Sequence, residues 1–201
     1  AQKRVILFSP HPDDDVISMG GTFSKLIKQG HDVHVVYQTS GNIAVTDDEA
    51  LKFAEVCNDF IGGKKDLEIN FQEVINFINN KKENEVDSPE VRKLKGLIRR
   101  RESLAATRYI GLKDENTHFL DLPFYETGRI KKNPLSDEDI TIVKDIIEKI
   151  KPHQVFAAGD LADPHGTHEV CLNAILAAMT SLKREPYMKD CWLWLYRGAW
   201  H

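Results

Sequence analysis

An apolar run that ends in two prolines constrains the fold of this chain more than any other stretch. Val5–Phe8 is short and wholly apolar, which is typical of a strand buried on both faces of a sheet. Pro10 and Pro12 follow it at once. Proline cannot donate a ladder hydrogen bond, and it disfavours helix at the residue before it. We therefore expect a buried central strand that ends in a tight turn.

One imidazole and three consecutive carboxylates occupy that turn: His11, Asp13, Asp14 and Asp15. The carboxyl end of a central strand is where open α/β sheets bind ligands. Adjacent carboxylates repel one another, and burying them without a cation is costly. His11 and Asp14 lie three residues apart, a suitable spacing for two ligands of one metal ion. The alternative is an acidic helix N-terminus that complements the helix dipole, but the His-Pro-Asp-Asp order after a buried strand favours the metal site.

Strand and helix patterns alternate along the rest of the chain, which predicts a parallel sheet. The fold class is therefore α/β, a Rossmann-like doubly wound and mainly parallel sheet of about five strands with flanking helices. We expect a single domain over residues 1–201, with a helical insertion over about residues 46–87. Further strands are expected at 32–38, 117–122, 154–158 and 192–196, and helices at 17–29, 46–60, 89–110, 136–150 and 168–182.

Composition excludes several classes of protein. The formal net charge of −4 gives no electrostatic footprint for nucleic acid. No apolar run approaches the roughly 18 residues of a transmembrane helix, and because a strand pattern begins at the fifth residue we expect no signal peptide other than one already cleaved. The three cysteines, Cys57, Cys171 and Cys191, form no Cys-x-x-Cys pair, so we expect reduced thiols and a cytoplasmic protein. The sequence leaves open a homo-oligomer.

His165 and His168 provide a second half for the metal site. They lie three residues apart, just after the strand expected at 154–158, so they face the same crevice as the first turn. His11, Asp14 and one of these two histidines would form a two-His, one-carboxylate site, which suits Zn²⁺ with a fourth position for water. Fe²⁺ and Co²⁺ suit the same atoms. The other histidines are expected to be structural or superficial: His31, His34, His118, His153 and His201.

Two further stretches are candidates for substrate contact. Ser40 and Gly41 belong to a polar loop at the carboxyl end of the second strand, although loops of this composition are often simple turns. Arg99 lies in a basic stretch of the long helix expected at 89–110. That stretch is either a solvated face with local ion pairs or the source of one arginine that holds a polar substrate group.

These motifs together resemble the LmbE/PIG-L family of metal-dependent N-deacetylases, which act on N-acetylglucosaminyl groups. The specific part of the resemblance is His11-Pro12-Asp13-Asp14 after the first strand and His165-x-x-His168 near the end. Supporting positions are spread over most of the chain: Ser40-Gly41, Arg99-x-x-Glu102, Ala105-Ala106, Gly111 and Leu120-Asp121-Leu122-Pro123.

The resemblance implies a role for each matching residue. His11, Asp14 and His168 would bind Zn²⁺, and Asp13 would be the general base. His165 would stabilise the oxyanion or protonate the leaving amine, and Arg99 would contact the substrate. The implied reaction is hydrolysis of an N-acetyl amide on a small amino sugar or glycoconjugate.

This sequence departs from the family pattern in three places. Asp15 stands where the family usually has Glu, and Asp163-Pro164-His165-Gly166-Thr167-His168 replaces the commoner His-Pro-Asp-His wording. The stretch 46–87 is longer than in many relatives, which affects the substrate pocket more than the chemistry.

The chain is also similar to LmbE-like domains fused behind a glucosamine-6-phosphate deaminase domain in some bacterial proteins, which would make it a fragment of a longer protein. Two other functions remain open: a non-catalytic metal- and sugar-binding domain attached to such a deaminase, and a metal phosphoesterase.

Overall fold

The computed structural model describes residues 1–62, 70–129, 131–159 and 166–198 of the chain. Two compact units share these residues. The first comprises Ala1–Ser40, Glu102–Thr127 and Lys132–His201, and the second comprises Gly41–Arg101 and Gly128–Lys131. The first unit contains the whole sheet.

The sheet has the strand order β3-β2-β1-β4-β5, and every neighbouring pair is parallel. This is the order of a Rossmann-like doubly wound sheet. Successive strands are added on one side of β1 up to β3 and on its other side from β4 onward, so the strand order reverses between β1 and β4. The predicted fold class is confirmed. The strands are β1 (Arg4–Ser9), β2 (Asp32–Tyr37), β3 (Thr117–Phe119), β4 (Gln154–Ala158) and β5 (Trp192–Tyr196).

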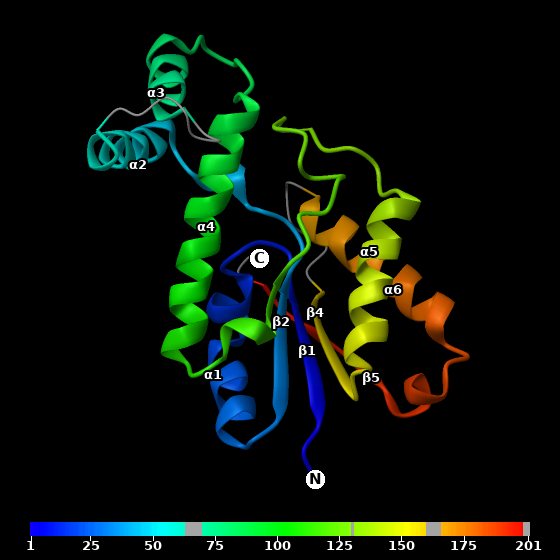
Figure 1. Cartoon of the computed structure of the whole chain (residues 1–201). Coiled ribbons are helices and arrows are strands. Elements are labelled where there is room, and N and C mark those ends of the chain that lie inside the picture. Colours follow the sequence, from blue (N-terminus) through cyan, green and yellow to red (C-terminus); the bar gives the residue numbers. More distant parts are fainter. Residues whose placement is uncertain (63–69, 130, 160–165, 199–201) are drawn as a thin grey trace. The chain divides into compact units, whose positions relative to one another are not determined.

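Strand β1 lies between β2 and β4 in the middle of the sheet, and helices cover both of its faces. Ile6 and Phe8 enter an apolar cluster with α5 (Asp137–Ile150) and α6 (Thr167–Leu182). Val5 and Leu7 point to the opposite face, into a cluster with α1 (Asp14–Lys28). Figure 1 shows α1 on one side of the sheet and α5 and α6 on the other. A run with no polar alternation is what such a doubly covered strand requires.

The second unit is helical. It holds α2 (Asp47–Phe60), α3 (Phe71–Asn80) and the first part of α4 (Pro89–Tyr109), packed around an apolar cluster of their own. The ammonium groups of Lys81 and Lys95 each pair with the carboxylates of both Asp47 and Asp87. This closed set of ion pairs ties the start of α2 to α4.

Short 3-10 turns among the described residues are Asn42–Ala44, Asp114–Asn116 and Pro186–Asp190.

Some boundaries differ from those expected. Helix α1 begins at Asp14 rather than Ile17, which places two acidic residues in its first turn. The third strand was expected to reach Leu122 but ends at Phe119. Asp121 has a φ of 47°, a left-handed conformation that breaks an extended strand.

Other local expectations agree with the structure. Cys57, Cys171 and Cys191 are free thiols. Nδ1 of His31 accepts from the Lys3 backbone N–H, and Nδ1 of His153 accepts from that of Arg4, so both have structural roles. None of the described helices combines the length and the apolar character needed to cross a bilayer.

A pair of stacked imidazoles links β2 to β3 and should make stability depend on pH. His34 Nδ1 lies 3.0 Å from His118 Nε2, and the two rings stack. Burial, together with the nearby charges of His34 and Lys149, lowers the pKa of His118 from 6.5 to about 4. Burial also lowers the pKa of His34.

We expect the free energy of unfolding to fall as the pH is lowered from about 6.5 to about 4, because the unfolded chain takes up these protons first. The expected loss from the pair is roughly 1–2 kcal/mol after solvent screening. Urea unfolding across this range measures it. His118→Phe keeps a stacked ring and should flatten the profile. An unchanged slope in His118→Phe would contradict the assignment.

Candidate metal centre

Three side chains from two crossover connections converge at the carboxyl end of the sheet. His11 lies in the turn after β1, Asp14 is the first residue of α1, and His168 is the second residue of α6, the helix that follows β4. Strands β1 and β4 are the neighbours between which the sheet reverses. The group therefore lies at the topological switch point, where doubly wound sheets bind their ligands.

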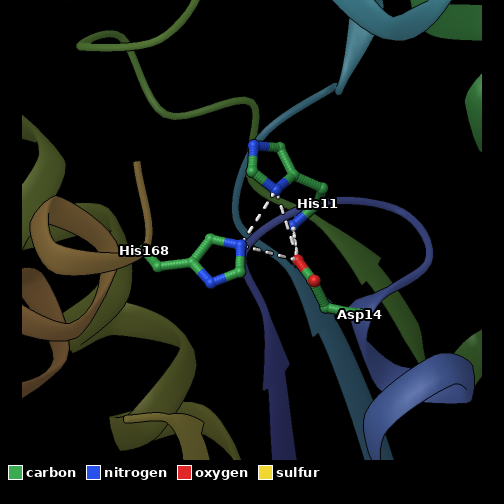
Figure 2. Close-up of side chains that lie close together, drawn as sticks. All are labelled: His11, Asp14 and His168. Atoms are coloured by element: carbon green, nitrogen blue, oxygen red, sulfur yellow. Dashed lines mark hydrogen bonds and ion pairs between the residues drawn. The ribbon is translucent and has the colours of Figure 1, made fainter. Parts of the chain in front are cut away.

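The three candidate ligand atoms form a nearly equilateral triangle (Figure 2). His11 Nδ1 lies 3.2 Å from Asp14 Oδ2, His168 Nε2 lies 3.3 Å from the same oxygen, and the two nitrogens are 3.3 Å apart. His168 is 1% exposed and Asp14 8% exposed, whereas His11 is half-buried. Of the three side chains, that of His11 is therefore the most accessible to solvent.

This triangle fits a single metal ion. In a tetrahedral zinc site with bonds of about 2.0–2.1 Å, two ligand atoms lie about 3.3–3.4 Å apart. The three measured distances match that spacing. The donor set is two imidazoles and one carboxylate, the ligand types that Zn²⁺ shares with Fe²⁺ and Co²⁺. In the part of the chain that the structure describes, this is the only cluster of three such residues.

Asp14 is held in its ionised form. Burial alone would raise the pKa of its carboxyl, but hydrogen bonds and charge interactions with His11 and His168 outweigh burial and bring the pKa well below its usual range. The His11 backbone N–H also donates to Asp14 Oδ2 over 2.9 Å. A carboxylate that stays charged beside two imidazoles is suited to binding a cation.

Asp15 is hydrogen-bonded to the residues that form the turn after β1 and to the neighbouring strand β2. Its carboxylate accepts a hydrogen bond of 2.8 Å from the Tyr37 hydroxyl and lies 3.4 Å from Ser9 Oγ. Its backbone N–H donates to Ser9 Oγ, which itself donates to the His11 carbonyl. Asp15 is fully buried, and burial raises its pKa to about 6. Asp15 therefore supports the turn from inside the protein and does not join the triangle.

Asp13 lies at the N-cap of α1 but makes no side-chain cap hydrogen bond. Capping is the usual use of an aspartate at this position. The backbone of Asp13 instead forms the hydrogen bonds at the start of the helix. Its N–H donates to the His11 carbonyl, and its own carbonyl accepts from the N–H groups of Val16 and Ile17. The half-buried side chain of Asp13 therefore does not cap α1.

The remaining expected site residues fall in different parts of the chain. Ser40 donates both its backbone N–H and its hydroxyl to the carboxylate of Glu126, each over 3.0 Å, so it anchors the loop that carries Glu126. Gly41, with a φ of 64°, and the half-buried Arg99 belong to the second compact unit. Substrate contact by Ser40, Gly41 and Arg99 stays a prediction. His165 lies outside the described residues.

Sequence reasoning missed Tyr125 as a neighbour of this centre. Its ring packs edge-on against His11, with 5.8 Å between the ring centres. The Lys132 ammonium group lies over the Tyr125 ring, 3.6 Å from its centre. The sequence shows only that these residues follow a strand in a loop. That position does not predict the contact of Tyr125 with His11 or with Lys132.

Comparison with known proteins gives a family and a fold. Residues 6–179 match the family described as GlcNAc-PI de-N-acetylase, PIG-L. Over 205 residues the chain is 52% identical to a Bacteroides thetaiotaomicron protein named as glucosamine-6-phosphate deaminase-like, an alignment that covers 98% of this chain and 31% of that protein.

Two solved structures share the fold. The N,N'-diacetylchitobiose deacetylase from Pyrococcus horikoshii is 22% identical with a TM-score of 0.60, covering 96% of this chain and 60% of its own. The 4-carboxy-2-hydroxymuconate hydratase GalB from Pseudomonas putida is 20% identical with a TM-score of 0.54, covering 92% and 59%. The chain thus spans 31% of the curated relative and about three fifths of these solved chains.

The support beneath the turn can be tested at Tyr37. Tyr37→Phe should lower the free energy of unfolding by about 1–3 kcal/mol at neutral pH, because it leaves a buried carboxylate without its shortest hydrogen bond. Urea unfolding measures the loss. Tyr187→Phe is the matched control, since the buried Tyr187 hydroxyl has no hydrogen-bond partner among the described residues. Equal effects of the two substitutions would contradict a supporting role for Tyr37.

Proposed function

Because the chain belongs to the GlcNAc-PI de-N-acetylase (PIG-L) family, we propose that it hydrolyses the N-acetyl group of an N-acetylglucosamine-type sugar or glycoconjugate. The observation that carries this proposal is the triangle of His11, Asp14 and His168 at the switch point of the sheet. The donor spacing, the ionised Asp14 and a neighbouring carboxylate on Asp13 that does not cap α1 are the parts that metal-dependent amide hydrolysis requires.

In this proposal His11, Asp14 and His168 hold one Zn²⁺, with Fe²⁺ or Co²⁺ as alternatives. A bound ion of this kind supplies a Lewis acid that polarises the amide carbonyl and makes water more acidic. The two imidazoles must be neutral at the nitrogens that face the ion, and the nearby carboxylate must be charged. The lowered pKa of Asp14 supports that requirement.

Asp13 is proposed as the general base. Its carboxylate takes the proton of the attacking water while the water oxygen forms a bond to the acetyl carbon. The amide C–N bond then breaks, and the sugar nitrogen leaves as an amine after it gains a proton. We assign that proton, or stabilisation of the oxyanion, to His165. The products are acetate and the free amino sugar.

Two other functions were weighed against this one. A metal phosphoesterase commonly uses two ions, and the described residues offer a single cluster of three ligands. A non-catalytic metal- and sugar-binding domain would need no general base beside the metal ligands, whereas the hydrolase uses Asp13, the residue next to Asp14, in that role. The hydrolase explains more of the arrangement than either alternative.

The proposed partner is a small amino sugar or glycoconjugate. We also propose that the chain acts as one domain over residues 1–201 and that it forms part of a longer protein, as its short coverage of the Bacteroides relative suggests. The reaction of that longer protein, its location and any homo-oligomer stay predictions.

The metal assignment predicts the outcome of a metal analysis. Wild-type protein purified with Zn²⁺ should contain about one ion per chain, and His168→Ala should contain close to none, because a site with two protein ligands binds zinc weakly. His31→Ala is the control, since His31 accepts a backbone hydrogen bond far along the chain from the triangle. Mass spectrometry of the metal content measures it. Full occupancy in His168→Ala would exclude His168 as a ligand.

The base assignment predicts a loss of turnover without loss of metal. Asp13→Asn should lower the rate of acetate release from N-acetylglucosamine or a related sugar by about 10²–10⁴-fold, because the amide cannot accept the water proton. Metal content should stay at the wild-type level. Asp48→Asn changes an exposed aspartate in the first turn of α2 and serves as the control. Wild-type turnover in Asp13→Asn would overturn the assignment.

A further inference from the structure

A lysine lies close to the candidate metal centre and takes no part in the proposed chemistry. The Lys132 Nζ atom is 3.6 Å from the centre of the Tyr125 ring. That ring is 4% exposed and packs edge-on against His11 at an interplanar angle of 68°. All three residues belong to the first compact unit. A cation is therefore held one aromatic ring away from a candidate metal ligand.

Among the described residues, few groups accept hydrogen bonds from Lys132. An ammonium group has three donors. One of them reaches the Tyr125 carbonyl over 3.4 Å, a long hydrogen bond. Within the described ranges, no carboxylate forms an ion pair with Lys132. The nearest acidic neighbour in sequence on this loop, Glu126, directs both carboxylate oxygens to Ser40.

The lysine is nevertheless half-buried and charged. Burial lowers its pKa from 10.5 to about 8, and the charge of Glu126 raises it. At neutral pH the group is therefore mostly protonated. The exposed part of such an ammonium group is hydrated, and an anionic substituent would replace that water with charged acceptors. The cation–π contact with Tyr125 stabilises the ammonium charge but provides no hydrogen-bond acceptor.

We propose that Lys132 is a specificity residue that binds an anionic substituent of the amino sugar, a phosphate ester or a carboxylate, while the acetamide lies at His11, Asp14 and His168. This proposal rests on the proposed function. The acetamide itself is neutral, so the charge must be carried elsewhere on the sugar. Lys132 is one ring removed from His11, which suits recognition of a second group on the same molecule.

Lys132 is not proposed as a catalytic residue. The ring of Tyr125 contacts both Lys132 and His11, and the ammonium contacts of Lys132 within the described residues are the ring and the carbonyl of Tyr125. Its charge should change how tightly an anionic substrate binds, with a smaller effect on the chemical step. The expected signature is therefore a change in KM for charged substrates and little change in kcat.

The test compares three substrates on the metal-loaded enzyme: N-acetylglucosamine, N-acetylglucosamine 6-phosphate and N-acetylmuramic acid. Lys132→Met keeps the length and the apolar contact with Tyr125 but removes the charge. It should lower kcat/KM about 10- to 100-fold for an anionic substrate, mainly through KM, and leave neutral N-acetylglucosamine within about threefold. Lys132→Arg should retain most of the activity on the anionic substrate. Lys131→Met, at the exposed neighbouring position, is the matched control.

The two anionic substrates separate the sources of charge. A loss confined to the 6-phosphate assigns a phosphate ester, and a loss confined to N-acetylmuramic acid assigns a carboxylate. Equal losses on all three substrates would mean that Lys132 is only structural and would overturn the proposal. The proposal would also be overturned if Lys132→Met had the same kcat/KM as the wild type on every substrate, charged or neutral. That result would leave the proposed function intact.

A binding measurement removes the dependence on turnover. Calorimetry with inorganic phosphate and with glucosamine 6-phosphate is done on chelator-treated protein, so that no metal ion holds the anion. Wild-type protein should bind glucosamine 6-phosphate at least about tenfold more tightly than Lys132→Met. Such binding without acetate release from any substrate would reject the proposed function and support the anion site. Equal binding by the two proteins would overturn the anion site.

Discussion

The hydrogen bonds between Ser9 and Asp15 are the constraint on which the candidate metal centre depends. Ser9 Oγ accepts from the Asp15 backbone and donates to the His11 carbonyl, which closes the turn after β1. Tyr37, at the end of the neighbouring strand β2, fixes the Asp15 carboxylate over 2.8 Å. Because these groups are buried, the turn has little freedom to open. His11 and Asp14 are brought together by the same turn that starts α1.

Three consecutive aspartates can occupy this turn because each has a different environment. Asp14 faces two imidazoles, which bring its pKa well below the usual range. Asp15 points into the protein, where burial raises its pKa to about 6. Asp13 is half-buried at the N-cap. Different directions and different surroundings reduce the repulsion that the sequence alone implies.

The sequence was sufficient for the sheet and for most of the triangle because both depend on local patterns and parallel topology. The apolar run of β1 and the alternation of strands and helices predict a doubly wound sheet, and its strand order then brings residues after β1 and β4 together. The choice of His168 over His165 came from family resemblance. The early end of β3 could not be predicted, because it depends on the left-handed backbone of Asp121. Tyr125 and Lys132 were missed because a contact between a loop and a turn leaves no periodic pattern.

In the two proposals made above, reaction type and substrate preference depend on different parts of the same unit. The groups proposed for the chemistry lie in the turn after β1 and at the start of α6, where the sheet fixes their positions within the unit. Tyr125 and Lys132 come from the segment that follows β3, which is irregular and is attached through Ser40 and Glu126. Connecting segments tolerate change in sequence better than a buried turn at the centre of a sheet. A fold of this kind can keep one hydrolytic centre while the residues one ring away from it alter which sugars it accepts.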